Sequence, residues 1–425
     1  MRLAAVFLVA FFYHATSPVS QQGDSRWTVF TAMSLLREGN VDLNEYGKEI
    51  EASGFYAIEC VTGSERRYPI HSLAECSGGR LYNFYPISIS LLATPLIAMQ
   101  WGLLRLLPFS AEAIAHPVLR GYLKADPAAG SPIFEIVAAS VFAALATMLF
   151  YRVALRYLDE RQALFAAFVF SACTPMVSTA SRALWQHGVL AALLCAVLLV
   201  LPRAPVGPLL ALAFFVRPTA AIPIALLGIF LLRQDRKKAL RAALWGLPVV
   251  AGFVALNYQM YGMPLAPYFF PVRAGSTSLG MHSHYVEALA GTMVSPARGL
   301  LVYMPFLVLA PLAWRSGSAE WRRLAGWIGA MVFGHWMLIS LHSDWWGGHA
   351  FGPRYFTDVT PLLLFLMLPV IGAQRKAFLA LALVAFLIHF RGSHFVATQI
   401  WNVTPVNVND DTSRLWNWSD PPFLR

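Results

Sequence analysis

The stretch GPLLALAFFVRPTAAIPIALLGIFLL, residues 207–232, is apolar except for Arg217 and Thr219. As a helix, a run of this length crosses the roughly 30 Å hydrocarbon core of a bilayer. An arginine within such a run costs about 2.5 to 3.5 kcal/mol at mid-membrane, so it usually faces a wet cavity or a partner. Arg217 is followed by Pro218, which interrupts helical hydrogen bonding. We therefore expect a broken helix at this position, with a cavity beside Arg217.

Similar apolar runs recur along almost the whole chain, in which 57% of residues are hydrophobic and 13% are charged. We count about eleven candidate spans by their length. They are residues 3–18, 87–107, 133–151, 164–180, 189–201, 207–232, 244–256, 299–312, 324–341, 355–371 and 377–390. The sequence thus predicts one all-α polytopic membrane domain over residues 1–425.

The net charge of +10 does not indicate nucleic-acid binding, because the basic residues lie in short connections rather than on one face. The densest basic connections are residues 233–241, 315–323 and 373–376, and the positive-inside rule predicts that they are cytoplasmic. Alternation then places residues 20–85, 257–298, 342–354 and the tail 392–425 outside. The arginines of residues 151–161 oppose this count, so the topology between residues 107 and 201 stays open.

The N-terminal segment MRLAAVFLVAFFYHATSPVS has two interpretations, a cleaved signal peptide or an uncleaved first span. We favour the span. Asp24 follows this segment and lies on the outer side in both cases.

The first external segment, residues 20–85, predicts two kinds of structure. WTVFTAMSLLREGN, residues 27–40, has the apolar spacing of an amphipathic helix on a membrane surface. Residues 55–86 contain short β-prone runs broken by glycines, which predict a hairpin. An oxidising compartment would let Cys60 and Cys76 close a ring of about 15 residues, worth about 3 kcal/mol. The alternative is two unpaired thiols, and Cys173 and Cys195 are expected to be inert core residues.

The segment 257–298 is rich in Tyr, Phe, Pro and Gly. This composition suits a lid or cleft wall as well as it suits an interfacial aromatic belt. We find no metal-binding spacing in the sequence and expect neither a metal nor another cofactor.

Asp24 is the first candidate for chemistry. A carboxylate just before a helix is an ordinary N-terminal cap, bonded here to the N–H of Trp27 or its neighbour. It is also suited to be a general base, which needs a carboxylate fixed near an acceptor hydroxyl. The sequence alone allows both roles.

The second candidate is HSDWWGGHAFGPRYF, residues 342–356. Pro353 suits the first turn of a helix, whose free N–H groups, with Arg354, would form a phosphate site. Alternatively, Arg354 pairs with Asp358 one turn on. Trp345 and Trp346 are either sugar-stacking or belt residues. The predicted sugar and acceptor cleft comprises Trp345, Trp346, His342, Asp344, Tyr82 and Tyr85.

Other arginines in or beside apolar runs are Arg182, for which snorkelling to an interface is the ordinary explanation, and Arg298 at an external helix start.

The order of several motifs resembles the bacterial GT-C superfamily of integral membrane glycosyltransferases. That superfamily includes protein O-mannosyltransferases, the aminoarabinose transferases of lipid A and the mycobacterial arabinosyltransferases. The motifs are GDSRW (23–27), SRALWQHG (181–188), VRPTA (216–220), SPARGLLVYMP (295–305) and WWGGHAFGPRY (345–355).

The resemblance implies that a sugar moves from a polyprenyl phosphate to a hydroxyl on a glycan, lipid or protein, with inversion, at the outer face of a bacterial inner membrane. Asp24 matches the family's catalytic acid, and Arg354, Arg80, Arg217 and Arg298 are candidate donor-phosphate ligands. Two departures stand out. Tyr85 occupies a position that is basic in some relatives, so another residue must contact the donor phosphate. Asp24 has no adjacent acid, which favours a monophosphate donor used without a metal ion.

Two other functions remain open from the sequence. A lipid flippase or transporter would use Arg182 and Arg217 as pathway residues, but it needs no long first loop, and we find no internal repeat. A ligase or polymerase would use a polyprenyl-pyrophosphate donor.

Overall fold

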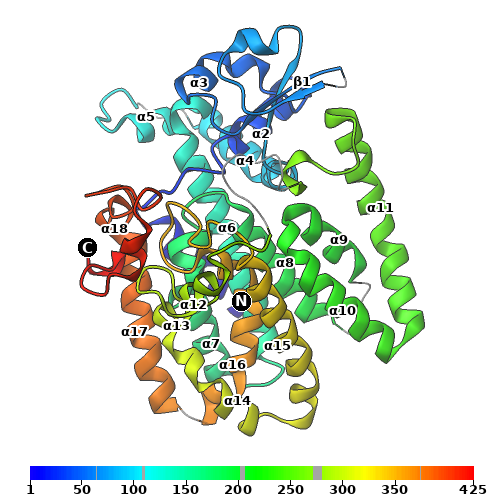
Figure 1. Cartoon of the computed structure of the whole chain (residues 1–425), viewed down its shortest axis with the longest axis vertical. Coiled ribbons are helices and arrows are strands. Elements are labelled where there is room, and N and C mark those ends of the chain that lie inside the picture. The colour runs from blue at the N-terminus through cyan, green and yellow to red at the C-terminus, as the bar shows by residue number, and fades with distance from the viewer. Residues whose placement is uncertain (64, 108–110, 202–205, 271–279, 374) are drawn as a thin grey trace.

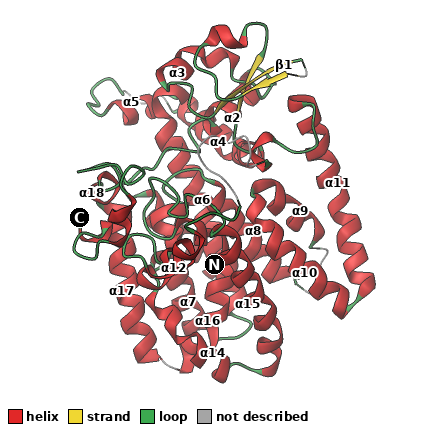
Figure 2. Ribbon diagram, in the orientation of Figure 1, coloured by secondary structure: helices red, strands yellow, loops and turns green. Residues whose placement is uncertain are grey.

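The structure is a computed structural model, and it describes residues 1–425 apart from 64, 108–110, 202–205, 271–279 and 374. Most of the described chain is helical (Figures 1 and 2). The long helices form a bundle. Residues 27–83, apart from 64, form a small unit with a β-sheet at one end of the bundle, which we call the N-terminal unit (Figure 1).

Five helical segments in the described residues are long and apolar enough to cross a membrane. They are α4 (Ser88–Leu106), α6 (Pro127–Ala154), α11 (Arg236–Tyr261), Arg354–Ala373, which ends in α16 (Thr360–Ala373), and Lys376–His394 of α17 (Arg375–His394). Each coincides with a predicted span. These helices fit a membrane protein, whereas the predicted number of about eleven spans is not confirmed.

The other predicted spans correspond to helices outside this group of five, most of them shorter. These are α1 (Arg2–Ala15), α7 (Glu160–Ala172), α8 (Gln186–Val200), α9 (Gly207–Val216), α10 (Ala221–Gln234), α13 (Leu300–Tyr303), α14 (Ala310–Ser316) and α15 (Ala319–Ile339). Outside these runs lie α5 (Pro117–Leu123), α12 (Tyr285–Val294) and α18 (Ala397–Ile400).

Local sequence explains where the long helices begin and end. Asp126 caps α6, since its Oδ1 accepts from Ala128 N at 2.9 Å, and Pro127 occupies the first helical position. Asp235 caps α11 in the same way, and Gly262 ends it with a φ of +67°. The bundle core lies around α6, which packs against α1, α5, α7 and α8.

The break predicted at Arg217 is present. α9 ends at Val216, Arg217 is extended with φ −154° and ψ 124°, and a 3-10 turn over Pro218–Ala220 precedes α10. The backbones of α9 and α11 are in close contact at Gly207. A Cβ atom at this position would lie only 1.7 Å from Ala242 O. Only glycine permits this approach.

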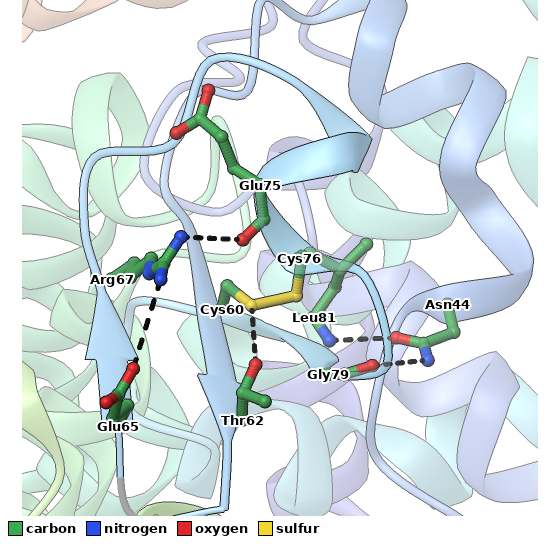
Figure 3. Close-up of a disulfide and its surroundings, with 9 residues drawn as sticks. All are labelled: Asn44, Cys60, Thr62, Glu65, Arg67, Glu75, Cys76, Gly79 and Leu81. Carbon is green, nitrogen blue, oxygen red and sulfur yellow. Dashed lines mark hydrogen bonds and ion pairs between the residues drawn. A yellow bond between two sulfur atoms is a disulfide. The ribbon is translucent and has the colours of Figure 1, made fainter.

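The N-terminal unit contains α2 (Thr28–Arg37), α3 (Gly47–Ala52) and the strands β1 (Ile58–Thr62), β2 (Glu65–Arg67) and β3 (Arg80–Asn83). The strands form one antiparallel sheet in the order β2-β1-β3, so the predicted hairpin gains a third strand. Cys60 and Cys76 form the predicted disulfide, which joins β1 to the turn before β3 (Figure 3). The unit has its own apolar core, which includes Trp27, Phe30 and Leu81.

The prediction for α2 is wrong in one respect. Every residue from Thr28 to Ser34 is buried, so this part of the helix has no free face to lie on a membrane surface. α2 packs against α4 and α6 instead. Its apolar spacing reflects protein neighbours on several sides.

Two of the three later segments predicted to be external, 257–298 and 392–425, are partly built into the fold. Within 257–298, α11 continues to Tyr261 and α12 occupies Tyr285–Val294, while residues 271–279 of this predicted lid lie outside the described residues. The tail 392–425 packs on the bundle: Leu415 O accepts from Ser295 Oγ at 2.5 Å, and Glu287 Oε1 accepts from Trp416 Nε1 at 3.0 Å.

Candidate functional site

A small polar cavity, partly open to solvent, lies where the N-terminal unit meets the bundle. Its lining comes from five distant parts of the chain. These are the segment leading into α2, the start of α4, the start of α8 with the residues before it, Arg217 and Arg354. The lining includes Asp24, Tyr85, Trp185, His187, Arg217 and Arg354. Four of these, Asp24, Tyr85, Arg217 and Arg354, were candidates from the sequence.

Asp24 pairs with Arg354, which lies 330 positions away in the sequence. Its other carboxylate oxygen, Oδ1, accepts from the Tyr56 hydroxyl at 3.0 Å. The predicted capping role is wrong, because α2 starts at Thr28 and has no side-chain cap. Asp24 lies one turn too early in the chain, and its carboxylate is held by the arginine instead.

Arg354 makes contacts on several sides of its guanidinium group. Besides Asp24, it donates from Nε to His187 Nε2 at 3.3 Å and from Nη1 to Gly347 O at 3.2 Å. Its Cζ lies 4.1 Å from the centre of the Trp185 ring, a cation–π contact. The alternative pairing with Asp358 is wrong, because Asp358 belongs to a second network described below.

Tyrosines surround the Asp24 carboxylate. Trp27 Nε1 donates to Tyr56 O at 2.7 Å and so fixes Tyr56 to the start of α2. The Tyr56 and Tyr85 hydroxyl oxygens are 3.4 Å apart, and the rings of Tyr85 and Tyr268 have centres 5.3 Å apart. The N-terminal unit and the segment after α11 therefore both border the site.

Charge neighbours set the ionisation of this group. Burial opposes ionisation of Asp24, but the Arg354 cation and hydrogen bonds from Arg354, Tyr85 and Tyr56 outweigh it, so its pKa lies below the ordinary value. Burial and the Asp24 charge raise the pKa of Tyr56 and of Tyr85, which therefore stay protonated as donors. Asp24 is ionised near neutral pH.

A second carboxylate network lies behind the cavity wall. Asp358 pairs with Arg217, binds His187 Nδ1 at 2.7 Å and accepts from Thr219 Oγ1 at 2.9 Å. Arg217 Nη1 also donates to Gln186 Oε1 at 2.6 Å. The break at Pro218 thus lets Arg217 leave the helix axis and join this network. Arg217 lines the cavity while its charge is matched by Asp358.

Glu135 of α6 fixes the position of the Asp24 segment. The fully buried carboxylate accepts from Ser25 Oγ at 2.6 Å, Gln22 Nε2 at 2.7 Å and Leu184 N at 3.2 Å. One acid therefore clamps the residues flanking Asp24 and the residue before Trp185. Nearby, Arg182 is fully buried and donates to Ser17 O at 2.7 Å and Val19 O at 3.1 Å, so it binds backbone rather than lying at an interface.

Several predicted site residues hold the adjoining loop 342–353 instead of lining this cavity. Arg298 donates to Trp346 O at 2.9 Å, Gly348 O at 3.1 Å and Asn402 Oδ1 at 2.7 Å. Trp345 is buried against Trp416. Trp346 donates its N–H to Asn409 Oδ1 at 2.8 Å. These groups join the loop to the C-terminal tail.

The other predicted residues also lie outside the lining of the cavity. His342 stacks on Tyr355, and Asp344 O accepts from Gly347 N at 2.9 Å. Arg80 is exposed at the start of β3, and Tyr82 is buried against Tyr261. The turn after Pro353, predicted to hold phosphate, is a 3-10 turn that contributes only Arg354 to this cavity.

Sequence reasoning missed Glu135, Tyr56, Trp185 and His187. Glu135 had a usable signal, because it is an acid within the apolar run 133–151. Trp185 and His187 stood in a quoted motif with no role assigned. Tyr56 gave no signal, since only the fold brings it to Asp24.

The fold and the site together define a helical protein suited to a membrane, with an acid–arginine pair at a polar cavity. Scans of the chain against protein-family models, curated proteins and solved structures found no match. A function for this protein therefore has to be argued from the geometry of the cavity.

Proposed function

We propose that this protein is a membrane glycosyltransferase of GT-C type, with about eleven membrane passages, acting at the outer face of a bacterial inner membrane. It transfers a sugar from a polyprenyl-phosphate donor to a hydroxyl acceptor with inversion. One observation carries the proposal: Asp24 and Arg354 meet in a cavity at the end of a bundle of apolar helices. A base and a phosphate ligand are thereby adjacent beside helices that suit a lipid.

The roles follow from the chemistry of the two groups. As the acceptor oxygen attacks the anomeric carbon, its proton passes to the Asp24 carboxylate. The bond from that carbon to the phosphate oxygen breaks, and the phosphate leaves with the electron pair. Arg354 stabilises the charge that grows on the departing phosphate. Asp24 then returns the proton to water.

The ion pair between Asp24 and Arg354 imposes an order on these events. A donor phosphate competes with Asp24 for the Arg354 guanidinium, since both are anions that suit the same donors. Donor binding therefore frees the carboxylate before the acceptor hydroxyl arrives. Tyr56 keeps one oxygen of Asp24 in place through its hydroxyl.

The transporter alternative is less well supported by the contacts. Of its two proposed pathway residues, Arg182 is fully buried on backbone carbonyls and Arg217 is matched by Asp358. The ligase alternative differs in its donor, a pyrophosphate, and the choice of donor in the assay below distinguishes it.

The test compares the wild type with Asp24→Asn, purified and reconstituted in lipid nanodiscs. The probes are polyprenyl monophosphate and pyrophosphate donors carrying labelled pentoses or hexoses, offered with membrane glycolipid acceptors. We expect transfer from a monophosphate donor and a loss of about 10²- to 10⁴-fold in rate for Asp24→Asn.

Asp410→Asn is the matched control, since Asp410 is exposed in the tail, and equal thermal melting checks folding. Full transfer by Asp24→Asn would remove the base assignment. Transfer by the wild type from none of the monophosphate donors would remove the function.

A further inference from the structure

Trp185 carries a buried hydrogen-bond donor for which the described part of the chain offers no acceptor. Its side chain is 5% exposed and lines the cavity, and Nε1 has no partner among the described residues. Other buried indoles behave differently: Trp27, Trp321 and Trp401 each donate to a backbone carbonyl. A buried N–H without an acceptor costs free energy, which a ligand oxygen in the cavity would recover.

The same place is the N-terminus of a long helix. Trp185 is the N-cap residue of α8, which has 15 residues and no side-chain cap. The first N–H groups of a helix have no partners within it, and they carry a partial positive charge. Leu184, Gln186 and His187 line the cavity at this helix start. A helix N-terminus of this kind favours an anion.

The charges around the cavity determine where an anion can bind. Arg217 is matched by Asp358, and in the described chain Asp24 is the carboxylate paired with Arg354. Arg354 also lies over the Trp185 ring, with its Cζ 4.1 Å from the ring centre. An entering anion can therefore exchange with Asp24 at Arg354 while it accepts from the Trp185 N–H.

We propose that the start of α8, the Trp185 N–H and the Arg354 guanidinium form a phosphate-binding site. The ligand class is a phosphate ester. The proposal rests on the proposed function only in taking the lipid-linked sugar donor to be the molecule that carries this phosphate. Trp185 would then be a binding residue that recognises a phosphate oxygen. The N–H groups of the site are those at the start of α8, whereas the turn after Pro353 contributes only the Arg354 side chain.

The experiment removes the N–H and keeps the ring. Trp185 is replaced by 3-benzothienylalanine, in which sulfur stands in place of N–H, and binding to nanodisc-embedded protein is measured by calorimetry. The probes are inorganic phosphate, farnesyl phosphate and farnesol. We expect the replacement to weaken binding of farnesyl phosphate about tenfold, the loss expected for a hydrogen bond to a charged group, and to leave farnesol binding unchanged.

The same replacement at Trp321 is the matched control, because that N–H donates to Phe365 O at 3.3 Å and Trp321 does not line the cavity. It should leave phosphate affinity unchanged. Displacement of farnesyl phosphate by inorganic phosphate would show a site for any phosphate, and absence of displacement a site for the lipid-borne ester. Unchanged affinity for farnesyl phosphate in the Trp185 variant would overturn the proposal.

A second arm separates this site from the enzyme function. Asp24→Asn removes the anion that competes for Arg354, so we expect farnesyl phosphate to bind several-fold more tightly while sugar transfer is lost. Weaker binding by Asp24→Asn would contradict the exchange at Arg354. Phosphate binding that depends on Trp185 without any sugar transfer would keep the site and remove the function. The reverse result would remove only the site.

Discussion

The two carboxylate–arginine pairs of the site lie side by side but have different surroundings. Asp358 and Arg217 are 0% and 6% exposed, and His187 and Thr219 complete the bonding of the carboxylate. Asp24 and Arg354 are 28% and 12% exposed, and they line the cavity. His187 connects the pairs, since it binds Asp358 through Nδ1 and accepts from Arg354 through Nε2.

This difference separates a structural pair from one suited to chemistry. The Asp358 pair is closed, because its oxygens have three donors and no access to a ligand. The Asp24 pair is open, because either partner can exchange its contact for a ligand at the cavity. Breaking a buried pair leaves a charge without compensation, whereas a partly exposed group can turn to water.

The largest expected effect is on stability at the closed pair. Asp358→Asn leaves Arg217 buried without a counter-charge, so we expect a loss of about 3–5 kcal/mol in the free energy of unfolding. Asp24→Asn should lose less than about 1 kcal/mol, since water screens the open pair. Denaturant titration of both variants in micelles measures the two losses. Equal losses would show that the pairs do not differ as described.

A smaller effect is expected at Glu135, which positions the open pair. In Glu135→Gln, one carboxylate oxygen is replaced by an amide NH₂ group, which faces the donors of Gln22, Ser25 and Leu184. One buried donor therefore loses its acceptor, which we expect to lower the free energy of unfolding by about 1–3 kcal/mol. We expect sugar transfer to show about a tenfold lower kcat with little change in donor KM.

Adding Gln22→Glu restores one complementary contact to the amide and should recover part of the lost kcat. If the double variant recovers melting temperature but no rate, Glu135 has only a structural role.

The smallest expected effect is the pH dependence of the open pair. The pKa of Asp24 is lowered below its ordinary value, so its stabilising contribution is complete above the unfolded pKa of about 3.9. The contribution is lost as pH falls through the lower, folded pKa. The stability difference between wild type and Asp24→Asn should be constant from pH 5 to pH 8 and should shrink toward pH 3. A decrease already between pH 7 and pH 5 would show that Asp24 titrates near neutrality.

Part of the site could be predicted from the sequence, because a charged residue in or beside an apolar run is costly unless it has a partner or a role. Arg217 before Pro218 predicted a break and a cavity, and both are present. Asp24 and Arg354 were chosen as base and phosphate ligand, and they meet. The disulfide followed from two cysteines in one loop.

The expectations that failed assumed that a side chain contacts a residue near it in sequence. The sequence left open a capping role for Asp24 and a pairing of Arg354 with Asp358, because those partners are near in sequence. In the structure each binds a residue from a distant segment. Arg80, Arg298, Trp345 and Trp346 were grouped by residue type, yet they face a surface or hold the loop before Arg354.

The sequence by itself indicated a helical protein suited to a membrane and the residues worth testing, because apolar run length, charge placement and cysteine position act locally along the chain. Only the tertiary structure decided which acid meets which arginine and that Glu135 holds the Asp24 segment. It also left the Trp185 N–H without a partner among the residues that the structure describes. Those facts depend on contacts between segments far apart in the chain, and the packing of whole helices sets them. The break at Arg217 was readable locally, whereas the partner of Arg217 was not.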